Sequence, residues 1–135
     1  MITPNNSILT LFALLIASTL NSCSESKYAE RLVTTDKELN FAYTDKRGIK
    51  DENGIVYIIS QDYKKLIAYD HNEVKWTADI LKICEDDRPW KPGMIGKPEI
   101  RYLKLKEDKI HIVYGKHSFA SVDIIDGRVN CLGSD

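Results

Sequence analysis

The sequence predicts an all-β domain: a small antiparallel sheet, sandwich or partial barrel built from hairpins. Beyond residue 39, short apolar runs rich in β-branched and aromatic residues recur about every 8–12 residues, separated by Gly, Asn and Asp turn signals. The chain has 135 residues, 29% of them charged, and a formal net charge of −1. These values are typical of one soluble globular domain. They argue against a disordered chain and against a nucleic-acid binder that relies on a basic surface.

The expected strands follow these runs in order. Residues 39–43 alternate with period two, and the turn dipeptide Asn53-Gly54 precedes the apolar run 55–59. Polar residues 70–73 separate the next two runs, and Asp126-Gly127 predicts a type I′ hairpin near the end of the chain. The remaining expected strands cover residues 66–69, 74–78, 100–106, 110–114, 121–125 and 128–131.

The N-terminal region is uncharged and apolar. Residues 1–24 contain no charged side chain, and residues 8–20 contain neither Gly nor Pro. As a helix this run would span roughly 20 Å, which is short of the roughly 30 Å hydrocarbon core of a membrane. It therefore predicts a signal peptide over residues 1–22, cleaved from the mature chain. A buried N-terminal helix and an uncleaved membrane anchor are the alternatives.

The tetrapeptide Leu20-Asn21-Ser22-Cys23 resembles the lipobox of bacterial lipoprotein precursors. The resemblance implies that Cys23 becomes the first mature residue, S-diacylglycerated and then N-acylated. Ser24 resembles the residue that follows the acylated Cys in lipoproteins released to the outer membrane, so we expect that membrane, on its periplasmic face, over the inner one. Residues 1–7 depart from a typical signal because they lack Lys and Arg, which leaves a misassigned start open.

The chain has three cysteines, an odd number. If the lipid occupies Cys23, then Cys84 and Cys131 remain in an oxidising compartment, where a disulfide between them is expected. Two buried thiols are the alternative. No CxxC pair or metal-ligand spacing is present in the sequence, so we expect no metal and no cofactor.

The sequence divides into a signal peptide (1–22), a lipidated Cys and tether (23–38) with a short helical turn around residues 28–32, and an antiparallel β domain (39–135). A weak internal repeat relates residues 55–59 to 110–114, an offset of 55. Ala68-Tyr69-Asp70 and Trp76 resemble one blade of quinoprotein-type β-propeller repeats. Because a closed propeller needs at least about four blades, the expectation is two blade-like units in one small domain, with no quinone bound.

The connection between residues 85 and 98 holds three of the four prolines and is long for a loop between strands. Stiff, long loops often carry function, and Trp and Arg are common interface anchors. The sequence thus predicts a protein-binding loop with Arg88, Trp90, Met94 and Ile95 as its contacts. The alternative is a lid in which Trp90 and Ile95 cover an open end of the sheet.

No catalytic constellation can be argued from the sequence: the three histidines (His71, His111, His117) and the acidic triplet 85–87 form no known motif. We therefore expect a protein that is not an enzyme. The leading hypothesis is a bacterial envelope lipoprotein, anchored to the membrane through Cys23, whose β domain is a binding or structural module, with an envelope protein as its partner. The alternative hypothesis is an inhibitor or immunity-type lipoprotein that blocks a toxin or hydrolase through the 89–98 loop.

Overall fold

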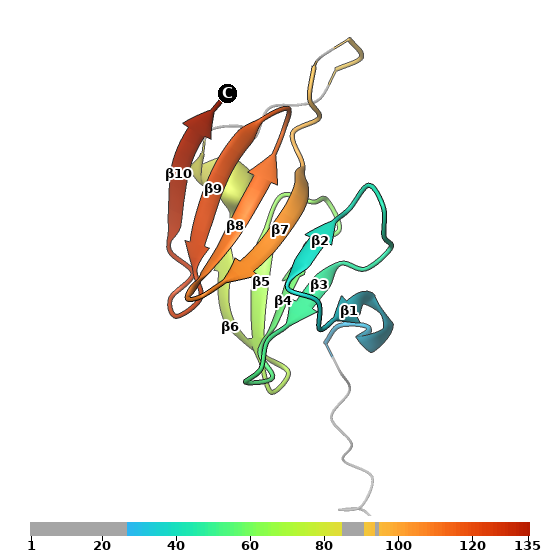
Figure 1. Ribbon diagram of the computed structural model, residues 1–135, viewed down its shortest axis with the longest axis vertical. Helices are drawn as coiled ribbons and strands as arrows, with labels where there is room; N and C mark the ends of the chain where they lie inside the picture. The colour runs from blue at the N-terminus through green and yellow to red at the C-terminus, as the bar shows by residue number, and fades with distance from the viewer. Residues whose placement is uncertain (1–26, 85–90, 94) are drawn as a thin grey trace, which may run out of the picture.

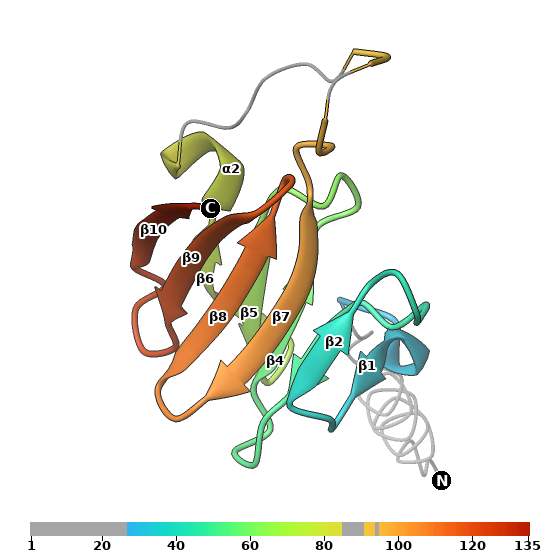
Figure 2. The ribbon, with the colours of Figure 1, turned by 45° about the horizontal axis from the view of Figure 1, so that its top comes forward.

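The structure is a computed structural model, and it describes residues 27–84, 91–93 and 95–135 (Figure 1). Two five-stranded sheets pack face to face around one hydrophobic core, and all but two short helical elements are strands (Figure 2). The all-β, sandwich-type expectation is confirmed.

The strands fall into two sheets. Sheet A has the order β1-β3-β4-β5-β6, and sheet B has the order β10-β9-β8-β7-β2. The strands of sheet A are β1 (Val33–Thr34), β3 (Gly48–Lys50), β4 (Val56–Ile59), β5 (Leu66–Asp70) and β6 (Glu73–Ala78). Those of sheet B are β2 (Glu38–Asn40), β7 (Ile100–Lys106), β8 (Lys109–Tyr114), β9 (Ser118–Asp123) and β10 (Val129–Ser134). The helical elements are η1 (Glu30–Leu32) and α2 (Ile80–Ile83).

The internal repeat corresponds to the two sheets. Strands β3 to β6 form one four-stranded antiparallel meander, and β7 to β10 form the other. The offset of 55 residues carries β4 onto β8 and β6 onto β10. The two units therefore stack as the layers of a sandwich.

The alternation of apolar residues fills the space between the sheets. In β8, Ile110, Ile112 and Tyr114 are buried and the intervening residues are less so, as expected of a strand with one face in the core. Ala68 of β5 pairs with Trp76 of β6, and both side chains belong to the core. The blade-like signature of this segment therefore marks core packing.

The strand connections gather at two opposite ends, which we name by their residues. The turn end holds the reversals at 51–55, 70–73, 107–108 and 123–128, together with the β1–β2 connection 35–37. The loop end holds residues 41–47, 60–65, 79–84, 91–99 and 115–117, and the C-terminus lies beside it (Figures 1 and 2). At the loop end, Ile80 and Leu81 of α2 are fully buried and close the space between the sheets.

The tether expectation is wrong for residues 28–38. The helical turn is present as η1, but β1 and β2 follow it at once, pairing parallel with β3 and antiparallel with β7. Sheet A is therefore mixed, sheet B is antiparallel throughout, and the fold begins before residue 39. Both strands lie at sheet edges, are two or three residues long and carry few apolar side chains. The expected strand 39–43 overlaps β2 at residues 39–40, whereas β1 is too short to give a period-two signal.

The hairpin predicted at Asp126-Gly127 is present, since β9 and β10 pair antiparallel, but its type I′ turn is wrong: Gly127 has a positive φ and Asp126 does not. Strand β9 ends at Asp123, and the chain reverses over residues 124–127. Ile124 is held in this turn because its backbone N–H donates to Asp108 and its carbonyl accepts from Trp76. A two-residue turn with both φ angles positive occurs instead at His71 and Asn72, where φ is 49° and 66°, as type I′ geometry requires.

Candidate functional site

Of the four residues predicted to contact a partner, Ile95 is the one that the structure describes. Its side chain is 75% exposed at the loop end. Arg88, Trp90 and Met94 lie outside the described residues, as do Cys23 and the acidic triplet 85–87. Since Ile80 and Leu81 close the end of the sandwich while Ile95 is exposed, Ile95 does not act as a lid.

Both flanks of the predicted loop are fixed to sheet B. Before the loop, Cys84 forms a disulfide with Cys131 of β10: the sulfur atoms are 2.04 Å apart and the Cα atoms 5.6 Å apart. After it, Gly96 packs against the backbone of Lys116, so closely that a Cβ there would lie 2.5 Å from the Lys116 nitrogen. Only glycine fits this approach, because Gly96 also has a φ of 79°. The loop is therefore displayed from two fixed points.

A cleft of about 640 Å³ lies beside Ile95, bordered by the β2–β3, β4–β5 and β8–β9 connections. Its aromatic wall is the edge-to-face pair of Phe41 and Tyr63, whose ring centroids are 5.9 Å apart. The guanidinium of Arg47 stacks on the Tyr63 ring at 4.3 Å, which holds that ring in place. Lys116 and Arg101 supply the cationic lining, and Arg101 donates a hydrogen bond to the Lys116 carbonyl.

The turn end is strongly acidic, whereas the described connections of the loop end carry a net positive charge. The turn end holds nine acidic residues and two basic residues: Asp36, Asp51, Glu52, Asp70, Glu73, Glu107, Asp108, Asp123 and Asp126 against Lys37 and Arg128. The described connections of the loop end hold eight basic and four acidic residues: Lys46, Arg47, Lys64, Lys65, Lys82, Lys91, Lys97 and Lys116 against Asp45, Asp62, Asp79 and Glu99. The net charge of −1 does not show this uneven distribution. The positive charge of the described loop-end connections favours the binding of acidic partner surfaces there.

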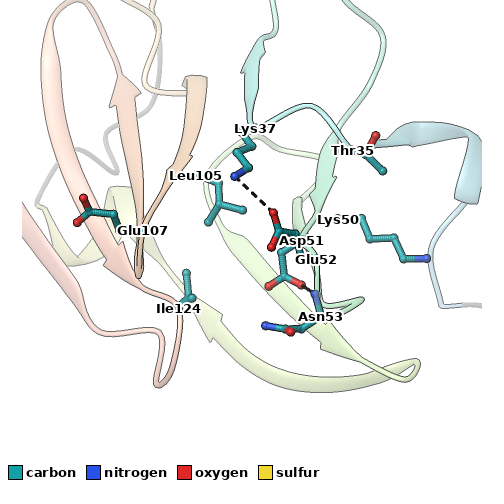
Figure 3. Close-up of a pocket in the computed structure, with 9 residues that line it drawn as sticks. All are labelled: Thr35, Lys37, Lys50, Asp51, Glu52, Asn53, Leu105, Glu107 and Ile124. Carbon is teal, nitrogen blue, oxygen red and sulfur yellow. Dashed lines mark hydrogen bonds and ion pairs between the residues drawn. The ribbon is translucent and has the colours of Figure 1, made fainter.

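A smaller cleft, of about 350 Å³, opens at the turn end between the sheets (Figure 3). Lys37 and Glu52 face each other across it, with Nζ and Oε1 3.7 Å apart. The Asp51 carboxylate accepts hydrogen bonds from the Asn53 and Ile55 backbone and, at 2.9 Å, from the Tyr57 hydroxyl.

These bonds make the turn-end cleft a weak candidate for catalysis. Burial, and then the bond to Asp51, raises the pKa of Tyr57 well above its ordinary value, so the hydroxyl stays protonated. Both oxygens of Asp51 are bonded to its own turn and to Tyr57. Within the described ranges, no group of three or more His, Cys, Asp or Glu side chains is arranged to hold a metal ion.

The structure does not bring the three histidines together. His111 lies within β8, between Lys104 and Ser121 of the neighbouring strands, whereas His117 is in the β8–β9 connection at the loop end. His71 is in the turn-end hairpin, where Nδ1 lies 2.6 Å from the Asp70 carboxylate. The sequence alone does not reveal the cleft beside Ile95, because its lining comes from four connections that are distant in sequence: β2–β3, β4–β5, α2–β7 and β8–β9.

Comparison of the chain with protein-family models, curated proteins and solved structures found no match. No helix among the described residues has the length and apolar character needed to cross a membrane.

Proposed function

We propose that this protein is a lipid-anchored bacterial envelope lipoprotein whose β-sandwich is a binding or structural module. The observation that carries the proposal is the order of features in the chain. The apolar run 8–20 leads into Leu20-Asn21-Ser22-Cys23, and the domain packs from Tyr28 onward. An exported, acylated protein needs these features in this order.

The position of Ile95 and the cleft relative to the start of the described chain supports a binding role. The described chain begins beside β1, on the opposite side of the molecule from the C-terminus (Figure 1), whereas Ile95 and the cleft lie near the C-terminus. A domain anchored through its N-terminus would thus hold the exposed apolar side chain and the cationic cleft away from its anchor.

Intact mass of the membrane-extracted protein tests the anchor. We expect loss of residues 1–22 and the added mass of diacylglyceryl and acyl groups, both abolished by Cys23→Ala. An unprocessed, lipid-free mass that is insensitive to Cys23→Ala would refute the proposal.

The alternative function is an inhibitor or immunity-type lipoprotein that blocks a toxin or hydrolase through the 89–98 loop. The fixed positions of Cys84 and Gly96 and the exposure of Ile95 favour it, since a segment whose two ends are fixed loses less entropy on binding than a free one.

Pull-down from envelope extract tests this alternative with a combined Trp90→Ala, Met94→Ala, Ile95→Ala variant. Ile125→Ala is the matched control, since Ile125 is 70% exposed at the opposite end. Loss of one discrete protein with the loop variant alone supports an inhibitor, whereas an unchanged set of partners counts against the loop.

A further inference from the structure

The outer face of sheet A, which points away from the core, is apolar at its centre. In β4, Tyr57 and Ile59 belong to the core, so Val56 and Ile58 face outward, yet both are buried. Their cross-strand neighbours on the same face are Tyr69 and Ile67 of β5. An outward apolar row of this kind needs a cover, because burying it stabilises the fold.

The residues that precede β1 provide part of that cover. We name residues 27–32 the strap. The Tyr28 ring lies 5.2 Å from the Tyr69 ring on the outer face. At the other end of the strap, the Leu32 carbonyl accepts a 2.7 Å hydrogen bond from the Arg47 backbone. The strap is therefore fixed to sheet A at both of its ends.

The strap leaves part of the face open. A groove of about 750 Å³ runs beside it, lined by apolar residues such as Ile67 and Tyr69 and by cations such as Lys27 and Lys65. Val74, which pairs with Tyr69, is 54% exposed on this face. Tyrosine, lysine and aliphatic side chains together are the composition that occurs at membrane–water interfaces.

The distance from the anchor restricts which surface can meet a membrane. Tyr28 lies five positions after Cys23, a reach of at most about 18 Å even when the chain is fully extended. The strap side of sheet A must therefore lie close to an acylated Cys23. The turn end is also near, but its nine acidic residues against two basic residues would be repelled by anionic lipids.

We propose that the outer face of sheet A lies against the bilayer, with the strap, Tyr69 and Val74 at the level of the lipid headgroups. This inference rests on the proposed acylation of Cys23. It directs the outer face of sheet B away from the bilayer, together with Ile95, which lies beside the β8–β9 connection of that sheet.

The test uses the full-length, lipidated protein in nanodiscs of phosphatidylethanolamine and phosphatidylglycerol. Val74 and Ile95 are replaced, one at a time, by a ketone-bearing amino acid that carries a nitroxide label, which leaves the native cysteines intact. Both sites are exposed, so the label fits either without disturbing the core. Nickel-chelating headgroups in the nanodisc then enhance relaxation of any label that lies near the bilayer.

We expect relaxation enhancement at position 74 to be several-fold greater than at position 95. Inserting a Gly/Ser segment of about 20 residues, with a reach of about 25 Å, between Ser26 and Lys27 should reduce that difference several-fold. Equal enhancement at both positions, or a greater one at 95, in protein whose mass includes the lipid would overturn the proposed orientation alone. Absence of the lipid mass would overturn the lipoprotein proposal and the orientation together.

Discussion

The indole nitrogen of Trp76 donates a 2.9 Å hydrogen bond to the carbonyl oxygen of Ile124. Trp76 belongs to β6, the edge of sheet A, and Ile124 belongs to the β9–β10 turn of sheet B. The disulfide joins the same two regions, since Cys84 follows β6 and α2, and Cys131 lies in β10. One side of the sandwich is therefore closed by a hydrogen bond toward the turn end and by a covalent bond toward the loop end.

Replacing Trp76 should open the turn end of this side. Trp76→Leu removes a buried aromatic side chain and leaves the Ile124 carbonyl without its indole donor. We expect the free energy of unfolding to fall by about 3 kcal/mol, measured by urea denaturation. A change within about 0.5 kcal/mol would show that the link between the sheets is unimportant.

The close packing of Gly127 on Trp76 predicts that the two positions are coupled. A Cβ on Gly127 would lie 2.6 Å from the indole Cδ2, and its φ is 75°. Gly127→Ala should therefore lower the free energy of unfolding by more than the roughly 1–2 kcal/mol of left-handed backbone strain alone. The same substitution made in the Trp76→Leu protein should lower it by less. Gly54→Ala is the control for strain alone, because Gly54 has a φ of 83° and nothing within 4 Å of its Cβ position. Additive effects at positions 76 and 127 would exclude the clash.

Reduction of the disulfide should release β10 first. The sequence separation of 47 between Cys84 and Cys131 corresponds to a stabilisation of about 4 kcal/mol by loop-closure entropy. Strand β10 contributes little to the core, since all its side chains beyond Val129 are exposed. We expect urea unfolding at lower concentration after reduction, and faster hydrogen exchange in β10 than in β9.

The double variant Cys84→Ala, Cys131→Ala is the matched control for that measurement. It should unfold like the reduced protein and should not respond to reductant. Equal stability of the oxidised and reduced proteins would indicate that the cross-link adds nothing to the fold.

The sequence predicted seven strands, β4 to β10, from their apolar and β-branched runs, and the expected strand 39–43 overlaps β2 at residues 39–40. It did not predict β1 and β3, because strands of two or three residues are too short to show a period-two pattern and their pairing joins segments distant in sequence. The odd number of cysteines led to the prediction that Cys84 pairs with Cys131, and the structure joins these two residues in a disulfide.

The sequence contains the charges of each connection, but the strand topology is needed to assign each connection to one end of the sandwich. In an antiparallel meander, successive connections lie at alternate ends. Here those at 51–55, 70–73, 107–108 and 123–128 are acidic, those at 41–47, 60–65 and 115–117 are basic, and the long connection 79–99 holds five acidic and four basic residues. Summing the charge by alternate connections would have shown the acidic turn end. The loop-end cleft could not be found this way, because it depends on how Phe41, Tyr63 and Arg101 pack.

Stability should decline at alkaline pH because of Tyr57. Burial and the Asp51 carboxylate raise the pKa of Tyr57 above its ordinary value of about 10. The folded chain thus retains a proton that the unfolded chain releases, so this stabilisation is complete below about pH 10 and is lost as the pH rises further. Urea denaturation from neutral to alkaline pH should show the decline, and Tyr57→Phe should flatten it.

Tyr102 provides the comparison for this prediction. Burial and its hydrogen bond to Glu38 raise the pKa of Tyr102 to about 12, so a smaller decline should persist in Tyr57→Phe. That decline should become smaller again when Tyr102→Phe is added, and a further part remains because burial and Glu30 also raise the pKa of Tyr28. An unchanged pH profile in Tyr57→Phe would mean that the buried hydroxyl does not govern alkaline unfolding.

Removing the Tyr28 ring should loosen the strap and leave the sandwich folded. Tyr28→Ala loses the contact with the Tyr69 ring, and we expect unfolding to become easier by about 1 kcal/mol. Limited proteolysis should also cut more readily after Lys27 or Arg31, since a released strap is a better substrate than one fixed to sheet A. Tyr43→Ala is the matched control, because that ring is 88% exposed and its loss should change neither measurement. If the two variants behave alike, the strap is not held by the aromatic pair, and the domain would be free to turn about its short link to Cys23.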